Sequence, residues 1–315
     1  MTSCCSPSRR EGTDTSVSVS APAPASSPAS SPADQPVTTR TIRGTAKLVQ
    51  LAGGEFTMGD NNAVGYPGDG EDQADVTVAP FSIGATSVTN AEFAEFVAAT
   101  GHLTDAQRYG WSFVFAGLLP DDFSETRGVL GAEWWRQVFG ATWKTPEGPH
   151  SDVGDREHHP VVHVSHSDAV AFAQWCSARL PTEAEWEFAA RGRTKTIWPW
   201  GDEREPEGEH RMNVFQGTFP HSNTAADGWN ATCPVDTYVP NVFGMHNMVG
   251  NVWEWTADAF SVSARHLRVD SDSPVLLKGG SFLCHDSYCR GYRPAARMGS
   301  AADSSSSNMG LRLAR

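Results

Sequence analysis

Apolar residues recur with helical spacing in three segments of the chain, and each segment carries capping residues at its ends. In "SVTNAEFAEFVAATGH" (87–102) one face collects the apolar side chains, namely Phe93, Phe96 and Val97. Thr89 and Glu92 form a capping box at its start, and Gly101 suits the C-terminal stop. This pattern predicts a helix between Thr89 and Gly101.

The segment "SHSDAVAFAQWCSARLPTEAEWEFAARG" (165–192) contains two further helical patterns. Ser165 with Asp168 is a plausible cap for the first, and Thr182 with Glu185 forms a capping box for the second. Gly192 suits the end of the second pattern. We therefore expect two short helices separated by a few residues.

Strand patterns are shorter and less regular than the helical ones. In "TAKLVQLAGGEFTMGD" (45–60) two apolar runs flank Gly53 and Gly54, which predicts a hairpin. The remaining segments are rich in turns and tryptophan, and the chain contains 29 Gly, 20 Pro and 11 Trp but only 19% charged residues. This composition predicts a loop-rich fold in which aromatic side chains anchor the loops.

The N-terminal region differs from the rest of the chain in composition. Residues 1–40, ending "APAPASSPASSPADQPVTTR", are mostly Ser, Ala, Pro and Thr and offer almost nothing large and apolar to bury. We expect a disordered tail at 1–40 and a single folded domain at 41–315. The tail lacks the apolar core of a secretory signal, and no apolar run approaches the roughly 20 residues of a membrane span. We expect a cytoplasmic protein.

The charge pattern excludes some classes of partner. The formal net charge is −13, and no block of Lys and Arg could follow a phosphate backbone. We therefore expect no nucleic-acid partner and no binding to an anionic membrane surface.

Six cysteines are present, two of them in the tail at Cys4 and Cys5. The folded part holds the other four, namely Cys176, Cys233, Cys284 and Cys289. Reduced thiols are expected in the cytoplasm, and Cys176 next to Trp175 fits a small buried hydrophobic residue.

The stretch "GGSFLCHDSYCRGYRPAAR" (279–297) places Cys284 and Cys289 in a glycine-flanked loop. A zinc site would need four ligands, and a disulfide would close a very short loop in a reducing compartment. Both stay open, but we rank two other interpretations above them, ordinary thiols in a packed loop or a pair of soft thiolates that hold Cu(I). The nearby arginines would favour deprotonated cysteines, namely Arg290, Arg293 and Arg297.

A histidine-rich stretch, "EHHPVVHVSHSD" (157–168), also suggests a metal site. If "PVVHV" is a strand, however, His163 lies on one face with Val161, and the histidines need not converge. We favour buried or surface histidines over a metal site here.

From about residue 45 to the C-terminus, the chain resembles the formylglycine-generating enzymes, the sulfatase-modifying factor family. The matching motifs include "GGEFTMGD", "SVTNAEFAEFV", "RLPTEAEWEFAARG", "FGMHNMVGNVWEWTAD" and "SSNMGLRLA". The most specific is "GGSFLCHDSYCRGYR", because most relatives of this fold lack the cysteine pair. The resemblance implies an α+β, C-type-lectin-like single domain that is loop-rich, with low regular secondary structure.

The resemblance also implies an activity. Enzymes of this family oxidise a cysteine in a CxPxR-type motif of an unfolded sulfatase to Cα-formylglycine, using copper, O2 and a thiol reductant. Cys284 and Cys289 would bind Cu(I), and the substrate thiolate would join them as a third sulfur. The implied oxygen pocket and substrate contacts are Ser281, His285, Tyr288, Arg293, Trp253 and Asn308. The resemblance leads us to expect a monomer.

Without the resemblance, Ser281 and Asn308 would be interpreted as turn residues and Trp253 as a core residue. Family members also carry two structural Ca²⁺ sites. The matching positions are Asn213, Val214, Asp227 and Trp229 for the first site, and Asn247, Met248, Gly250, Val252 and Glu254 for the second.

The chain departs from its secretory relatives at some positions. Pro294 and Leu313 stand where those relatives have disulfide cysteines, which leaves Cys176 without its expected partner. His166 stands where a Trp is common, and we expect only local repacking there.

Two functions are alternatives to the oxidation of a peptide cysteine. A non-catalytic binding module is possible for a lectin-like fold, but the cysteine pair argues against it. An iron-dependent sulfoxide synthase would require an extra helical domain with a His-rich iron site, which residues 1–40 cannot supply. For substrate binding, four tryptophans could line a peptide groove or serve as core and loop anchors, namely Trp111, Trp134, Trp135 and Trp143.

Overall fold

The computed structural model of the chain describes residues 7, 39–41, 47–61, 64–65, 70–270 and 272–315. The tail expected to be disordered, with Cys4 and Cys5, lies outside the described residues except for residue 7 and residues 39–40. Strand β1 (Thr39–Thr41) pairs antiparallel with β2 (Lys47–Leu51). Among the described residues, regular structure therefore begins at Thr39, slightly before the predicted domain boundary.

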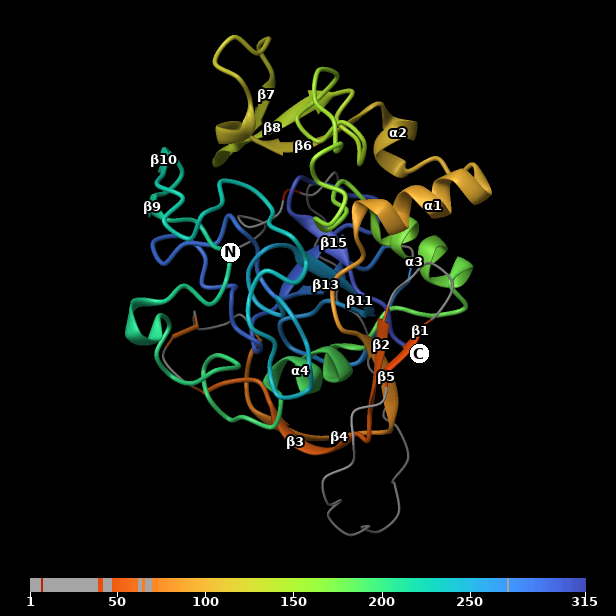
Figure 1. The fold of residues 1–315 in the computed structure, drawn as a ribbon, viewed down its shortest axis with the longest axis vertical. Coiled ribbons are helices and arrows are strands. Elements are labelled where there is room, and N and C mark those ends of the chain that lie inside the picture. Colours follow the sequence, from red (N-terminus) through yellow and green to blue (C-terminus); the bar gives the residue numbers. More distant parts are fainter. Residues whose placement is uncertain (1–6, 8–38, 42–46, 62–63, 66–69, 271) are drawn as a thin grey trace.

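The largest sheet lies at the centre of the molecule (Figure 1). Its strand order is β12-β11-β13-β14, and β15 pairs in parallel with β11. The strands are β11 (Trp253–Ala259), β12 (Leu267–Arg268), β13 (Val275–Lys278), β14 (Met298–Ser300) and β15 (Met309–Leu311). Nearly every residue of β11 and β13 is buried, so both faces of the sheet are covered at this point.

Smaller sheets surround this centre. β2 pairs with β5 (Phe81–Gly84), and β3 (Gly54–Met58) pairs with β4 (Ala74–Val78). A separate layer at the top of Figure 1 has the order β6-β8-β7, with β6 (Trp111–Phe115), β7 (Arg127–Val129) and β8 (Ala132–Phe139). Strands β9 (Gly217–Thr218) and β10 (Ser222–Asn223) form another two-stranded sheet, like β3 and β4.

The predicted hairpin across Gly53 and Gly54 is wrong. The two apolar runs do form strands, β2 and β3, but each pairs with a different partner that follows later in the chain. Gly53 has a φ of +69°, and a Cβ there would lie 2.1 Å from the Val78 carbonyl oxygen. The glycine therefore allows the chain to pass from one sheet to another.

The three predicted helices are confirmed, with their capping boxes. They are α1 (Asn90–Thr100), α3 (His166–Trp175) and α4 (Glu183–Arg191). Gly101 and Gly192 end α1 and α4 in the left-handed conformation, as expected. The sequence analysis did not predict α2 (Asp105–Tyr109), and two single 3-10 turns lie at η1 (Ala116–Leu118) and η2 (Pro206–Gly208).

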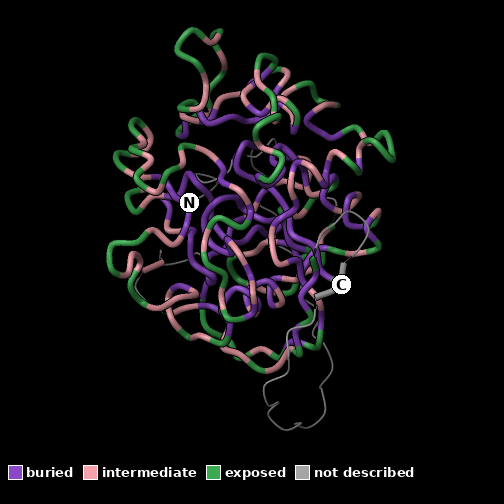
Figure 2. The backbone as a smooth tube through the Cα atoms, viewed as in Figure 1, coloured by how far each residue is buried: buried purple, intermediate pink, exposed green. Residues whose placement is uncertain are grey.

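The buried residues fill the middle of the molecule and the exposed ones lie in the surrounding loops (Figure 2). Phe93 of α1 stacks on Phe172 of α3 with ring centroids 5.7 Å apart, so the predicted apolar face does point to the core. Cys176 is a buried free thiol at the end of α3 and belongs to the same cluster. Short strands, few helices and long irregular connections agree with the expected loop-rich α+β fold. In the described part of the chain, no helix has the length and apolar character that crossing a membrane requires.

The stretch "PVVHV" is not a strand; apart from one bridge between Pro160 and Thr89, residues 160–164 are irregular. His163 has a φ of +59° and its Nδ1 lies 2.8 Å from the Ser112 hydroxyl. His159 instead contacts the Thr232 hydroxyl at 3.0 Å. These histidines therefore have separate partners, and no cluster of three or more His, Cys, Asp or Glu among the described residues could hold a metal ion.

His166 begins α3 and lies edge-on to Trp255, with ring centroids 5.8 Å apart. Burial lowers the pKa of His166 to about 4, despite a hydrogen bond involving Thr256 that raises it. The unfolded chain therefore binds a proton at His166 near pH 6.5, whereas the folded chain binds it only near pH 4. As a result, the free energy of unfolding falls as the pH decreases from 6.5 toward 4.

We predict that replacing His166 with Phe removes this part of the pH dependence. Urea unfolding of wild type and His166→Phe near pH 7.5 and near pH 4.5 measures it. Wild type should lose about 2–3 kcal/mol more than the variant over this range. An equal loss in both proteins would contradict the assignment.

Candidate functional site

The loop at 279–297, here called the cysteine loop, leaves strand β13 and returns as strand β14. Helix α4 holds both of its ends. Lys278, directly before the loop, places its Nζ 3.0 Å from Glu187 Oε2, and Arg297 at the other end donates from Nε to Glu183 Oε1 at 2.7 Å. All four side chains are buried, and a buried charge of one sign requires a partner of the other.

A tight turn within the loop brings the two cysteines together. The backbone N–H groups of Tyr288 and Cys289 both donate to the carbonyl of His285, at 3.0 and 2.8 Å. The Sγ atoms of Cys284 and Cys289 lie 3.2 Å apart as a result. Cys284 is a free thiol, and both residues are buried. The expected convergence of the two sulfur atoms is therefore present in the fold.

Backbone donors point at both sulfur atoms. The N–H of Ser281 donates to Cys284 Sγ and the N–H of Gly291 donates to Cys289 Sγ, each at 3.3 Å. Burial raises the pKa of the Cys284 thiol to about 11, while hydrogen bonds from Ser281 and Gly291 and the charge of Arg293 oppose this rise. Without a further positive charge, the buried Cys284 sulfur therefore keeps its proton at neutral pH.

Ser281 and Asn308 lie next to each other although they are far apart in the sequence. The Asn308 side-chain NH2 donates to Ser281 Oγ at 2.9 Å, and both residues are buried. The Asn308 backbone is fixed by the N–H of Trp253, which donates to its carbonyl at 2.9 Å. Strands β11 and β15 therefore place Asn308 beside the cysteine loop, which contains Ser281.

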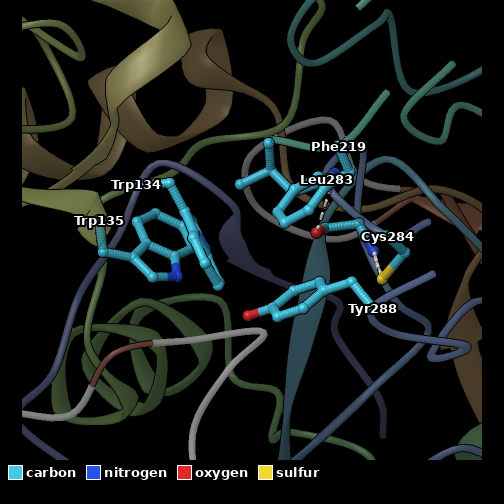
Figure 3. A pocket seen from close by; sticks show the side chains of 7 residues that line it. Trp134, Trp135, Phe219, Leu283, Cys284 and Tyr288 are labelled. Atoms are coloured by element: carbon cyan, nitrogen blue, oxygen red, sulfur yellow. Dashed lines mark hydrogen bonds between the residues drawn. The ribbon is translucent and has the colours of Figure 1, made fainter. Parts of the chain in front are cut away.

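Aromatic side chains line a narrow hollow beside Cys284, and they pack so closely that it leaves no room for a water molecule (Figure 3). Its lining residues are Trp134, Trp135, Phe219, Ser281, Leu283, Cys284 and Tyr288. The ring of Tyr288 stacks on Phe219 at 4.5 Å and meets the edge of Trp134 at 4.9 Å. The thiol thus faces a narrow, mostly apolar hollow, and the aromatic rings must move apart before a side chain can enter.

Two residues of this hollow were missed by the sequence analysis. Leu283 could have been found from its position next to Cys284. Phe219 lies 65 residues before Cys284 in the sequence, and nothing in its local pattern indicates where it points.

The four tryptophans proposed for a peptide groove separate into two groups. Trp134 and Trp135 of β8 line the hollow. Trp143 is buried against Phe93 in the main core, and Trp111 packs on the adjacent Phe113. Only the β8 pair therefore supports the groove expectation.

Trp253 lies at the back of the site, at the start of β11. A Cβ added to Gly291 would lie 2.5 Å from the Trp253 ring and 3.0 Å from Cys289 Sγ. The indole thus packs against the cysteine loop, and its buried Nε1–H has no hydrogen-bond partner among the described residues. Trp253 is both a core residue and a neighbour of the cysteine pair.

Arg293 occupies a different position from the one the resemblance implies. Its guanidinium pairs with Glu71 through two hydrogen bonds of 2.7 and 2.8 Å, and its Nε donates to the Arg290 carbonyl. It does not line the hollow, although its charge acts on Cys284. Its role as a substrate contact stays a prediction.

His285 is half-buried at the edge of the site. Its Nδ1 lies 2.8 Å from the Ser287 hydroxyl, and its ring meets Phe215 edge-on at 6.1 Å. It does not line the hollow, so contact with a ligand there would require its side chain to turn.

The four residues of the first expected calcium site converge. Asp227 accepts hydrogen bonds from the N–H groups of Val214 and Trp229, and Asn213 precedes Val214. Burial raises the pKa of the Asp227 carboxyl. The Asn213 side-chain oxygen is buried and has no hydrogen-bond partner within the described part of the chain. Buried oxygen atoms of this kind fit a hard cation such as Ca²⁺.

The second expected calcium set is occupied by protein contacts. Both carboxylate oxygens of Glu254 accept hydrogen bonds, from Arg312, from the Trp186 indole and from the Ser87 hydroxyl. A cation here would have to share this carboxylate with the Arg312 guanidinium. The other members, from Asn247 to Val252, lie in the loop that precedes β11.

Comparisons with known proteins agree with this geometry. The family model for the sulfatase-modifying factor enzyme 1-like domain matches residues 33–315. The chain is 51% identical over 282 residues to a formylglycine-generating enzyme of Streptomyces coelicolor, covering 86% of this chain and 90% of that protein. It is 49% identical over 280 residues to one from Thermomonospora curvata, covering 85% of this chain and 92% of that protein. The structure of PvdO from Pseudomonas aeruginosa superimposes with a TM-score of 0.65 at 25% identity, covering 90% of this chain and 99% of that chain. The expected single-domain, C-type-lectin-like fold is confirmed.

The packing around Gly291 generates a test of the site geometry. Because a Cβ there would overlap the Trp253 ring and press on Cys289, we expect Gly291→Ala to lower the free energy of unfolding by about 1–3 kcal/mol. Gly154→Ala is the matched control, because Gly154 is exposed and its added Cβ would meet only the flexible Asp152 side chain. Denaturant unfolding of both variants checks this. Equal stability of the two would refute the close packing.

Proposed function

Since the chain belongs to the sulfatase-modifying factor family of formylglycine-generating enzymes, we propose that it oxidises a cysteine of a sulfatase polypeptide to Cα-formylglycine at Cys284 and Cys289. The observation that carries the proposal is the pair of buried sulfur atoms 3.2 Å apart beneath an aromatic hollow. The substrate we propose is an unfolded segment with a CxPxR-type motif, because only an extended chain can bring a cysteine down to this depth.

The donor set suits copper. Two soft sulfur ligands, with no cluster of three or more His, Cys, Asp or Glu among the described residues, fit Cu(I) and not a four-ligand zinc site. Cys284 and Cys289 would hold the ion. Copper supplies the one-electron chemistry that allows dioxygen to react with a thiol.

The protein groups around the sulfurs have distinct tasks. The N–H groups of Ser281 and Gly291 stabilise negative charge on the two sulfurs. The rings of Trp134, Phe219 and Tyr288 exclude water and enclose the entering side chain. Ser281 lines the hollow and Asn308 supports it from behind, so the Ser281 hydroxyl would be the donor for a reduced oxygen species.

The electron balance requires an external reductant. Reduction of dioxygen to the level of water takes four electrons, and oxidation of the substrate cysteine to the aldehyde level supplies two. Two thiols supply the other two and leave as a disulfide. Hydrolysis then exchanges the substrate sulfur for oxygen and releases hydrogen sulfide.

A synthetic CxPxR peptide tests the proposal directly. We expect mass spectrometry to detect the peptide aldehyde after incubation in air with wild type, Cu(I) and a thiol. Cys284→Ser and Cys289→Ser should each reduce the rate at least about a hundred-fold, because removing a group essential to a catalytic unit abolishes most of its effect. Cys233→Ser, which changes a buried free thiol outside the site, is the control and should remain active. A folded, copper-loaded wild type that leaves the peptide unchanged would overturn the assignment and favour a binding module.

We further propose that Asn213, Val214, Asp227 and Trp229 hold a structural Ca²⁺, supported by the buried Asn213 oxygen without a partner among the described residues and by the half-buried Asp227 carboxylate. The second set, with Glu254, stays a prediction.

The calcium proposal predicts a dependence of stability on the ion. Adding Ca²⁺ to chelator-treated wild type should raise the melting temperature, because an ion that binds only the folded state stabilises it. Asp227→Ala should abolish this response. Asp236→Ala, which removes an exposed carboxylate a little further along the chain, should retain it. An unchanged melting temperature in wild type would contradict the site.

A further inference from the structure

The run of serines at 304–307 is buried, although serine is usually an exposed residue. The hydroxyls of this run reach different partners. Ser305 contacts Ser112 at 2.8 Å, and Ser307 accepts from the Phe115 N–H at 3.3 Å. Ser306 is directed at the candidate site, because its hydroxyl donates to Asn308 Oδ1 at 2.7 Å.

The Ser306 hydroxyl contacts the oxygen end of the Asn308 amide. With Oδ1 engaged by the Ser306 hydroxyl, the NH2 end of the amide points to Ser281 and donates to its Oγ at 2.9 Å. The Ser306 backbone cannot easily move, since its carbonyl accepts from the His163 N–H at 3.0 Å and the residue bridges to Phe113. A buried neighbour with a rigid backbone thus holds its hydroxyl beside the amide oxygen.

This orientation in turn directs the Ser281 hydroxyl. Its oxygen accepts from the Asn308 NH2 and from the Leu283 N–H at 3.3 Å. A serine hydroxyl has two acceptor positions and one proton. With both acceptor positions used, the proton must be donated away from these groups, and Ser281 lines the hollow beside Cys284.

We propose that Ser306 is a positioning residue, which holds the Asn308 amide so that Ser281 donates its hydroxyl proton into the hollow. If the amide turned over, its oxygen would face Ser281 and would itself accept that proton. The inference deepens the proposed function, on which it rests, because the donor is useful where negative charge develops on oxygen or sulfur. Ser306 does not line the hollow, and it acts through Asn308.

The test compares single serine variants in the peptide assay. We expect Ser306→Ala to lower kcat roughly ten-fold, as for other supporting residues behind a reactive group, with KM nearly unchanged. Ser306→Cys keeps a weak donor of similar size and should fall between wild type and Ser306→Ala. Ser307→Ala removes a buried hydroxyl of the same run that does not contact the Asn308 side chain, and it should keep kcat within about two-fold, since its role is structural.

A double variant separates positioning from general damage. In a Ser281→Ala background the donor is already absent, so adding Ser306→Ala should change kcat by less than about two-fold. Thermal unfolding of all variants identifies any that do not fold. If Ser306→Ala does not fold, the comparison of kcat between wild type and Ser306→Cys tests the proposal, and Ser306→Cys should have the lower kcat.

Full activity of Ser306→Ala, an equal loss in Ser307→Ala, or an effect that adds fully to that of Ser281→Ala would overturn the inference. Absence of turnover by wild type would instead overturn the proposed function.

Discussion

Two buried carboxylates on helix α4 hold both ends of the cysteine loop, and the arrangement of the site depends on them. Glu187 pairs with Lys278 before the loop, and Glu183 pairs with Arg297 after it. Burial alone would raise the pKa of Glu187, but the charges of Lys278 and Arg191 more than offset this and hold it below its usual value. Loss of one partner would leave an uncompensated buried charge. Separation of the loop from the helix therefore has a high cost in free energy.

This clamp explains how an irregular loop can hold two sulfur atoms at a defined separation. The loop contains no strand or helix of its own between β13 and β14. Its rigidity comes from the anchored ends, the tight turn at 285–289 and the packing of Gly291 on Trp253. The pair of Arg293 and Glu71 adds a third anchor in the middle of the loop. Buried ion pairs thus perform here the task that regular secondary structure performs in other folds.

The elements that could be predicted from the sequence are those determined by local interactions. Capping boxes such as Thr182 with Glu185 lie three residues apart, so their helices could be predicted. Strand pairing is not local, and the hairpin prediction failed because β2 and β3 pair with strands that follow later in the chain. The partner of Arg293 is 222 residues away, and no local pattern indicates it. Convergence of the cysteines was expected from the family resemblance, whereas the direction of the Ser281 donor required the contacts of Asn308 and Ser306.

The most direct test of the account is copper X-ray absorption on the Cu(I)-loaded protein, with and without a CxPxR peptide. The account predicts a sulfur-only environment from Cys284 and Cys289, and one more sulfur ligand when the peptide is added. An environment dominated by nitrogen or oxygen, or one that the peptide leaves unchanged, would contradict the claim that the cysteine loop brings copper and a substrate thiol together.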